Sequence, residues 1–150
     1  MEKYQENLKE AIKHLQIADH MTYVTYPLVN EQRLILKIFD EIYKSIINSI
    51  NAILNYEYLY KRIRLTENNL QTFAQKCAKQ YDLSNIQLKK IFEIIELNKR
   101  HQRSAMEFVK KDRIIILSDA LNTQTLDIFR IKQYLLLAKE LTMRANQRIQ

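Results

Sequence analysis

The sequence predicts an all-α protein: a bundle of four to five helices with one long central helix and a short extended segment near residues 113–117. Three observations predict this class. The 150 residues include no glycine and a single proline, so glycine-dependent hairpin turns have no place in the chain. Apolar residues recur at helical spacing over most of its length. One stretch, residues 113–117, is instead continuous and β-branched, which is typical of extended structure.

The first two helices are expected on either side of the proline. Apolar residues from about Glu2 to Thr25 fall on one stripe at about 100° per residue. Pro27 should end this helix, because the residue before a proline avoids the α conformation. Asn30 fits the N-cap of the second helix, over about residues 31–64. That helix is apolar round most of its girth, so it should be central, covered by its neighbours or by a second subunit.

Two shorter helices are expected to follow. Thr66 can cap a third helix that ends near Tyr81. Ser84 and Gln87 form a capping box for the fourth. The apolar stripe of this fourth helix drifts along the chain as far as Phe108, so helix is expected up to about that residue.

The C-terminal third combines an extended segment, a loop and a helix. Because a lone strand needs a partner, residues 113–117 should pair with a symmetry mate or lie packed along the bundle. Residues 118–125 are polar and predict a loop, in which Thr123 or Thr125 would cap the last helix. That helix is expected over about residues 126–147, with these residues facing inward: Phe129, Leu137, Ala138 and Leu141.

Length and composition are those of one globular domain, residues 1–150. The longest unbroken aliphatic run, residues 114–117, is far shorter than the ~20 residues that span a bilayer, and the N-terminus has no apolar signal region. The single cysteine, Cys77, cannot form an internal disulfide and lies at apolar spacing, so we expect it to be buried. We predict a cytoplasmic protein that has no membrane partner.

Positive charge is concentrated in the second half of the chain. The net charge is +7; residues 66–150 hold fifteen Lys and Arg against nine Asp and Glu. A one-sided basic surface favours nucleic acid or another acidic partner; the competing interpretation is a solvated helix face. The predicted nucleic-acid-binding residues are Lys99, Arg100, Arg103, Lys110, Lys111 and Arg113.

Tyrosines alternate along the chain just before another basic cluster. Aromatic rings mixed with cations can stack bases and hold phosphates. On a helix, however, three tyrosines at this spacing point in different directions, so most of them should pack at the edge of the core. The residues concerned are Tyr56, Tyr58 and Tyr60, followed by Lys61, Arg62 and Arg64.

His101 is the candidate catalytic residue. It continues an apolar stripe and is flanked by Arg100 and Arg103, with Ser104 one turn away. Burial amid arginines would disfavour its charged form, so it could act as a base near neutral pH, and the arginines could hold a phosphate. A core histidine bonded to a backbone carbonyl is the alternative.

Three residues near the end of the first helix are candidates for buried polar groups: Asp19, His20 and Arg33. Asp19 lies on the apolar stripe, where a carboxylate must be paired or protonated. Arg33 or a tyrosine hydroxyl could be its partner. His20 is adjacent in sequence but about 100° round the helix, so Asp19 and His20 do not face each other.

The sequence predicts no cofactor and no metal. Walker A, GxGxxG and GxSxG turns all need glycine, which the chain lacks. No histidine stands at i, i+4 from another, and no HExxH or Glu-x-x-His pair occurs.

The order of the predicted elements resembles the HEPN superfamily of α-helical domains. The strongest local match is the second helix, over Phe39–Leu54. HEPN ribonucleases carry an arginine, then four to six residues and a histidine, and they dimerise so that two motifs form one RNA-cutting site. Glu96 stands where such an arginine would precede His101. The resemblance therefore implies a homodimeric bundle associated with RNA, without the nuclease motif.

Three functions fit these observations. The first is a non-catalytic dimeric bundle that binds an acidic partner, above all RNA, through the basic residues within 99–113. The second is a metal-independent ribonuclease that uses His101 with Arg100 or Arg103. The third is an antitoxin-like protein–protein interaction module, in which the long second helix packs against another chain. An acidic protein is one such partner.

Overall fold

A computed structural model describes residues 1–102, 106–110, 113–117 and 123–149. The sequence prediction of a predominantly helical bundle is confirmed. The helices of this described part are α1 (Lys3–His20), α2 (Tyr26–Val29), α3 (Leu34–Leu59), α4 (Asn69–Thr72), α5 (Asn85–Gln102) and α6 (Ile128–Ile149). Two π-helical turns, η1 (Met21–Thr25) and η2 (Phe73–Cys77), follow α1 and α4. The strands are β1 (Met106–Lys110), β2 (Arg113–Leu117) and β3 (Thr123–Asp127).

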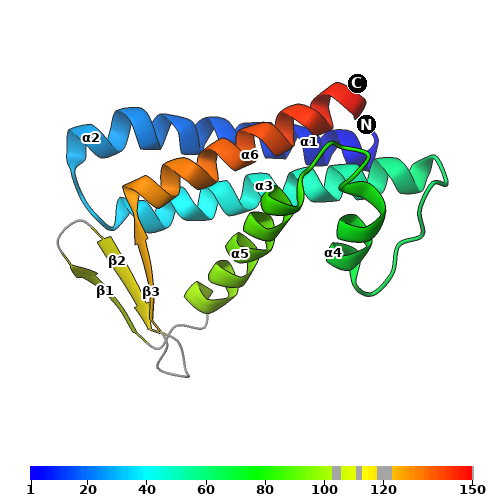
Figure 1. The fold of residues 1–150 in the computed structure, drawn as a ribbon. Coiled ribbons are helices and arrows are strands. Elements are labelled where there is room, and N and C mark those ends of the chain that lie inside the picture. The colour runs from blue at the N-terminus through cyan, green and yellow to red at the C-terminus, as the bar shows by residue number, and fades with distance from the viewer. Residues whose placement is uncertain (103–105, 111–112, 118–122, 150) are drawn as a thin grey trace.

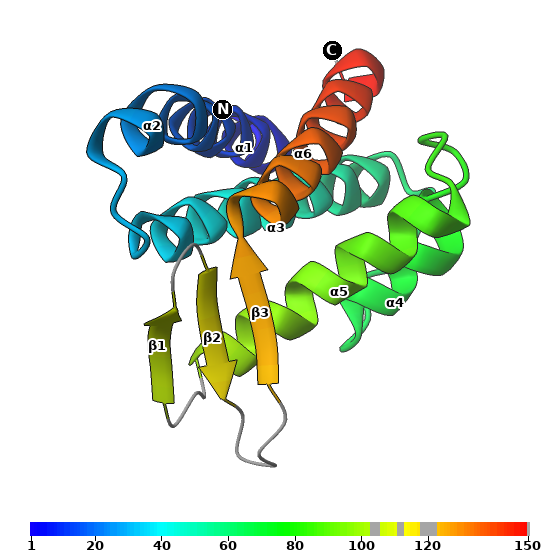
Figure 2. The same cartoon turned by 60° about the vertical axis from the view of Figure 1, so that its left-hand side comes forward.

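The long helix α3 is the centre of the molecule. Figures 1 and 2 show α1 and α6 on one side of α3, with α4 and α5 on the other and the sheet near its N-terminal end. The aliphatic side chains of α3 point to several sides of the helix and are fully buried, among them Ile38, Ile42 and Ile46. At 1.5 Å per residue, α3 is roughly 39 Å long. It is unbroken from Leu34 to Leu59, shorter at both ends than the predicted 31–64.

The expectation that Pro27 ends the first helix is wrong. The helix continues from α1 through η1 and α2 to Val29, with Pro27 as the second residue of α2. The wider π-helical turn ends at Thr25, so the missing N–H of Pro27 falls where the α-helical hydrogen bonding is already interrupted. Asn30, predicted to begin the next helix, instead ends this one in the left-handed conformation, at φ 53°.

Side-chain caps fix where the later helices begin. The capping box is confirmed: Gln87 N–H donates to Ser84 Oγ at 3.1 Å, and Ser84 N–H donates to Gln87 Oε1 at 2.9 Å. Asn68, rather than Thr66, caps α4 by accepting from Gln71 N–H at 3.1 Å. Asp127, rather than Thr123 or Thr125, caps α6 by accepting from Arg130 N–H at 2.8 Å. Carboxylate and amide oxygens are favoured at this position.

The extended segment 113–117 is confirmed as β2, and its partners are strands of the same chain. β1 and β3 flank it in an antiparallel sheet of order β1-β2-β3, with Ile115 opposite Phe108 and Thr125. Ile114 and Ile116, on one face of β2, are fully buried against the helices. The prediction of helix up to Phe108 is therefore wrong over β1, and the prediction of a loop over 118–125 is wrong where β3 begins at Thr123. The backbone N–H and C=O groups on both edges of β2 need hydrogen-bond partners, which β1 and β3 supply.

The last helix has the predicted position but not every predicted inward residue. Leu137, Ala138 and Leu141 are buried, whereas Phe129 is 73% exposed. None of the helices in the described part of the chain is both long and apolar enough to cross a membrane.

Candidate nucleic-acid interface

A carboxylate is buried where α3 ends. Glu57 has no exposed surface and faces three donors from different parts of the chain. Arg62 contacts its Oε2 from the loop after α3, and Tyr81 Oη donates to its Oε1 at 3.2 Å. Arg148 Nε, on α6, lies 3.4 Å from the same Oε1. A buried carboxylate needs such partners, because its unpaired charge would cost several kcal/mol.

The same carboxylate and its surroundings keep two neighbouring groups protonated. Burial and the charge of Glu57 raise the pKa of Tyr81 well above its ordinary value. Burial, and then Glu57, raise the pKa of the Cys77 thiol to about 11. Cys77 is fully buried on η2, as its apolar spacing predicts, so it is a core residue in this structure.

We expect Cys77 to resist alkylation in the native protein. At pH 8 a thiol with a pKa of about 11 is almost entirely protonated, and the thiolate is the nucleophile. Iodoacetamide labelling at pH 8, followed by mass spectrometry, should be slow in buffer and fast in strong denaturant. Equal rates in both conditions would contradict the burial of Cys77.

The chain leaves α3 by a Schellman motif. Arg62 N–H donates to Glu57 O, and Lys61 N–H donates to Tyr58 O, both at 2.9 Å. These two bonds define the motif, in which the residue between helix and loop is left-handed and is usually glycine. Here it is Lys61, at φ 58°. This turn ends α3 before residue 64, the predicted end.

Lys61 is unusual among the left-handed residues of the described chain. A second Schellman motif follows η2, where Leu83 N–H donates to Ala78 O at 3.0 Å and Asp82 has φ 57°. The remaining one is Asn30. Asn and Asp are enriched in this conformation because their short polar side chains bond locally. Lysine has no such compensation.

Replacing Lys61 with glycine should stabilise the protein. Lysine in the left-handed region costs about 1–2 kcal/mol, a cost that glycine avoids. The greater entropy of glycine in the unfolded chain offsets part of this gain. We therefore expect the free energy of unfolding to rise by about 1 kcal/mol, which corresponds to a rise of about 2–4 °C in Tm. Thermal unfolding followed by circular dichroism measures it. Asp82→Gly is the matched control and should gain less; an unchanged or lower Tm for Lys61→Gly would contradict the expectation.

Arg62 is held in place by aromatic rings as well as by Glu57. Its guanidinium carbon lies 5.3 Å from the ring centroid of Tyr56 and 5.1 Å from that of Tyr60, within cation–π range. The hydrogen bond to Glu57 raises the pKa of Arg62 above its ordinary value. Tyr58 and Tyr60 are each 53% exposed. They are therefore more exposed than the predicted packing at the edge of the core implies.

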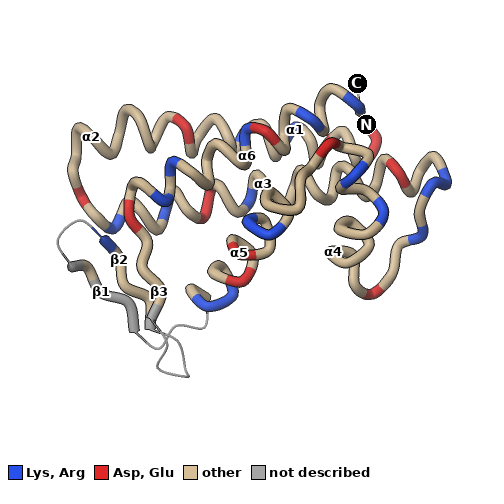
Figure 3. Tube along the Cα trace, in the orientation of Figure 1, with Lys and Arg blue, Asp and Glu red and all other residues tan. Residues whose placement is uncertain are grey.

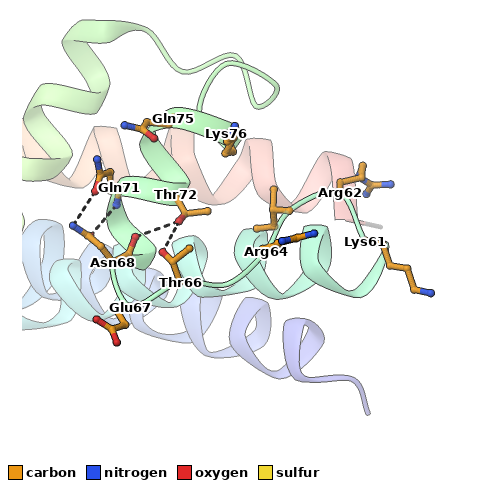
Figure 4. Close-up of a pocket in the computed structure, with 11 residues that line it drawn as sticks. Lys61, Arg62, Arg64, Thr66, Glu67, Asn68, Gln71, Thr72, Gln75 and Lys76 are labelled. Atoms are coloured by element: carbon orange, nitrogen blue, oxygen red, sulfur yellow. Dashed lines mark hydrogen bonds between the residues drawn. The ribbon is translucent and has the colours of Figure 1, made fainter.

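A hollow of about 840 Å³ opens beside this turn, and we call it the loop hollow. Figure 4 shows Asn68 and Gln71 hydrogen-bonded to each other at one end, and Lys61 and Arg62 at the other. Its lining residues are Lys61, Arg62, Ile63, Arg64, Thr66, Glu67, Asn68, Gln71, Thr72, Gln75 and Lys76. Four of them are basic and one is acidic.

A second hollow of about 1030 Å³ lies between the α4–η2 segment and α5, and we call it the α5 hollow. It shares Asn68, Gln71 and Gln75 with the loop hollow, so the two adjoin along these side chains. We call the combined surface the basic groove. The side chains particular to the α5 hollow are Leu70, Ala74, Ile86, Lys89, Lys90, Phe92, Glu93, Ile95, Glu96 and Lys99.

Most cations of the basic groove have no acidic partner. Figure 3 shows basic residues along the loop after α3 and near both ends of α5. Within the described residues, six of the groove's seven cations make no ion pair, the exception being Arg62. Of its three acidic residues, Glu93 is paired with Arg130 at 2.6 Å. The six cations are Lys61, Arg64, Lys76, Lys89, Lys90 and Lys99.

The basic residues predicted within 99–113 lie in different parts of the structure. Lys99 is exposed and lines the basic groove. Arg100 is half-buried and lines a further hollow of about 210 Å³, which shares Glu93 and Glu96 with the α5 hollow. Arg113 is exposed at the start of β2, which Figure 1 places near α3 and away from the C-terminal end of α5. Lys110 belongs to β1; Arg103 and Lys111 lie outside the described residues.

The candidate catalytic histidine lies at the end of α5. His101 is half-buried in the last turn, and its predicted neighbours Arg103 and Ser104 are outside the described residues. Arg100 precedes it on the same helix, and a composite site around His101 stays a prediction.

Two of the three polar residues predicted to be buried near the end of the first helix, His20 and Arg33, are exposed. Asp19 is half-buried: its side chain is 44% exposed, but its Oδ1 is covered. This Oδ1 pairs with Lys139 Nζ of α6 at 2.6 Å, rather than with Arg33 or a tyrosine. The carboxylate on the apolar stripe therefore has the charged partner that its position requires.

In the described residues, no group of three His, Cys, Asp or Glu side chains is arranged to hold a metal ion. The fold defines an α-helical bundle that carries a three-stranded antiparallel sheet between its last two helices. Comparison with models of known families and with curated proteins finds no match for the chain.

The basic groove is only partly visible in the sequence. The cluster at 61–64 is recognisable, but the spacing of the tyrosines before it favours packing at the edge of the core. The adjacent Lys89 and Lys90 on α5 complete the groove. What joins the two clusters is the chain reversal after η2, which no motif in the sequence indicates.

Proposed function

We propose that the protein binds single-stranded RNA in the basic groove, without catalysing a reaction on it. The observation that carries this proposal is the set of six cations that make no ion pair within the described residues and that line two adjoining hollows. Lys and Arg neutralise phosphates and release counterions, which supplies most of the affinity of such interfaces. Relative to the prediction from sequence, the groove keeps Lys99 and extends away from residues 100–113.

The apolar side of the groove supports a single strand over a duplex. Phe92 is 37% exposed and Ile86 is 71% exposed in the α5 hollow. An exposed ring beside lysines offers a surface on which an unpaired base can stack, whereas paired bases in a helix are not available for stacking. The basic groove thus combines the two features of single-strand binding, cations for the backbone and an apolar surface for bases.

The salt dependence of binding tests the proposal. Fluorescence anisotropy with a labelled single-stranded RNA of about 12 nucleotides measures Kd. If about four phosphates are neutralised, affinity should fall about 50-fold between about 50 and 200 mM salt. A duplex of the same sequence is the control and should bind more weakly. Absent binding, or an affinity that does not change with salt, would overturn the proposal.

The homodimer predicted from the sequence belongs to the same proposal. α6 exposes three apolar residues seven apart, Phe129, Leu136 and Met143, at 73%, 58% and 51%. A stripe at this spacing suits the matching helix of a second copy. Mass in solution, measured by light scattering, should be twice the 18.1 kDa of the chain, and Leu136→Lys should halve it. A wild-type monomer would refute the dimer without affecting the groove.

A further inference from the structure

The loop hollow gathers three cations that make no ion pair within the described residues, namely Lys61, Arg64 and Lys76. Its fourth cation, Arg62, is paired with Glu57, and Glu67 is the acidic residue of its lining. The α5 hollow has three lysines and two glutamates, of which Glu93 is paired with Arg130. Beside three unpaired cations, a ligand group that carries two negative charges would gain more than one that carries a single charge.

Two of these cations are fixed in ways that a solvated surface residue does not require. Lys61 stands in the left-handed position of a Schellman motif, and strain of this kind clusters at binding sites. Arg62 is bonded to the fully buried Glu57 and lies against Tyr56 and Tyr60. Its charge is thus already paired, so within the described residues the unpaired cations of the loop hollow are Lys61, Arg64 and Lys76.

Amide groups line the end of the loop hollow that adjoins the α5 hollow, away from Lys61 and Arg62 (Figure 4). Asn68 Nδ2 donates to Gln71 Oε1 at 3.3 Å, which orients both amides. Thr66 and Thr72 share a hydrogen bond at 3.0 Å, and Thr72 Oγ1 donates to Asn68 O at 3.2 Å, so both hydroxyl hydrogens are already used. The remaining amide N–H groups are of the kind that contact phosphate oxygens in nucleic-acid complexes.

We propose that the loop hollow holds a terminal phosphate of the bound RNA strand, a phosphomonoester, while the following nucleotides extend into the α5 hollow. This inference rests on the proposed RNA binding. A phosphomonoester carries a charge of about −1.5 to −2 at pH 7, because its second pKa is near 6. An internal phosphodiester carries only one charge. The two hollows meet at Asn68 and Gln71, so a strand that ends in one continues directly into the other.

The test compares one RNA in three forms: with a 5′-phosphate, with a 3′-phosphate, and with hydroxyl groups at both ends. We expect wild-type protein to bind one of the phosphorylated forms about tenfold more tightly than the hydroxyl form. Which end is preferred identifies the direction of the strand. Competition with inorganic phosphate should abolish this preference before it displaces the hydroxyl RNA.

Variants at the left-handed position separate charge from conformation. Lys61→Asn removes the charge but keeps a residue that tolerates φ 58°. We expect it to lose most of the preference and to bind the hydroxyl RNA within about threefold of wild type. Lys61→Arg should keep the preference. Asp82→Asn, at the matching position of the other Schellman motif, should change neither affinity, and thermal unfolding checks that each variant is folded.

The outcomes distinguish this inference from the proposed function. If wild-type protein binds all three RNAs equally, the terminal-phosphate site is refuted while RNA binding stands. If it binds none of them, both fail. If the preference survives in folded Lys61→Asn, the phosphate is held elsewhere and the assignment to the loop hollow is wrong.

Discussion

Glu57→Gln should lower the free energy of unfolding by about 3 kcal/mol. Removing one partner from a buried charge cluster costs about 3–5 kcal/mol. The lower value is expected because the side chains of Arg62 and Arg148 are 40% and 41% exposed and can regain water. For a chain of this length, the change corresponds to a fall of about 6–12 °C in Tm. Urea denaturation followed by circular dichroism measures it.

A matched acidic residue shows whether burial is the cause. Glu67 is exposed, so Glu67→Gln should change stability by less than about 0.5 kcal/mol. Glu57→Asp keeps the charge but shortens the side chain, and it should fall between wild type and Glu57→Gln. If Glu57→Gln were as stable as Glu67→Gln, the carboxylate would not organise the junction of α3, Tyr81 and α6.

Neutralising the lysines of α5 should have the largest effect on RNA binding. The triple variant Lys89→Gln, Lys90→Gln, Lys99→Gln removes three of the six unpaired cations of the basic groove. Each lost phosphate contact should reduce the slope of log K against log salt by about 0.7 for a single strand. At about 50 mM salt we expect affinity to fall by about 100-fold. Anisotropy titrations at several salt concentrations measure both quantities.

The control is a second triple variant with the same change in net charge, from +7 to +4. Lys13, Lys37 and Lys44 are exposed on α1 and α3, away from the groove. Replacing these three by glutamine should weaken binding by less than about threefold. Equal losses for the two triple variants would mean that the whole molecule attracts RNA and that the groove has no special role.

The sequence predicts the core of this protein better than its surface. The aliphatic residues of α3 are spaced so that only a central helix can bury them, and the capping box at Ser84 is a local motif. The outer strands were missed because β1 continues a helical apolar pattern, and because β3 is polar apart from Leu126. In both strands the pairing with β2 overrides the local pattern.

Long-range contacts explain why the candidate site was not predicted. Glu57 stands between two tyrosines and resembles any exposed helical glutamate, yet it is buried by Arg148, a residue near the other end of the chain. The groove depends on two clusters brought together by the left-handed turns at Lys61 and Asp82. Neither turn has the glycine that would have signalled it.

The central position of α3 has a consequence for hydrogen exchange. It packs against α1, α5, α6, η2 and β2, whereas α4 has extensive contacts only with η2. Amides of α3 should therefore exchange only when the whole protein unfolds, and those of α4 should exchange through local opening at a much lower free energy. One wall of the basic groove thus belongs to a helical segment that opens at a lower free energy than α3.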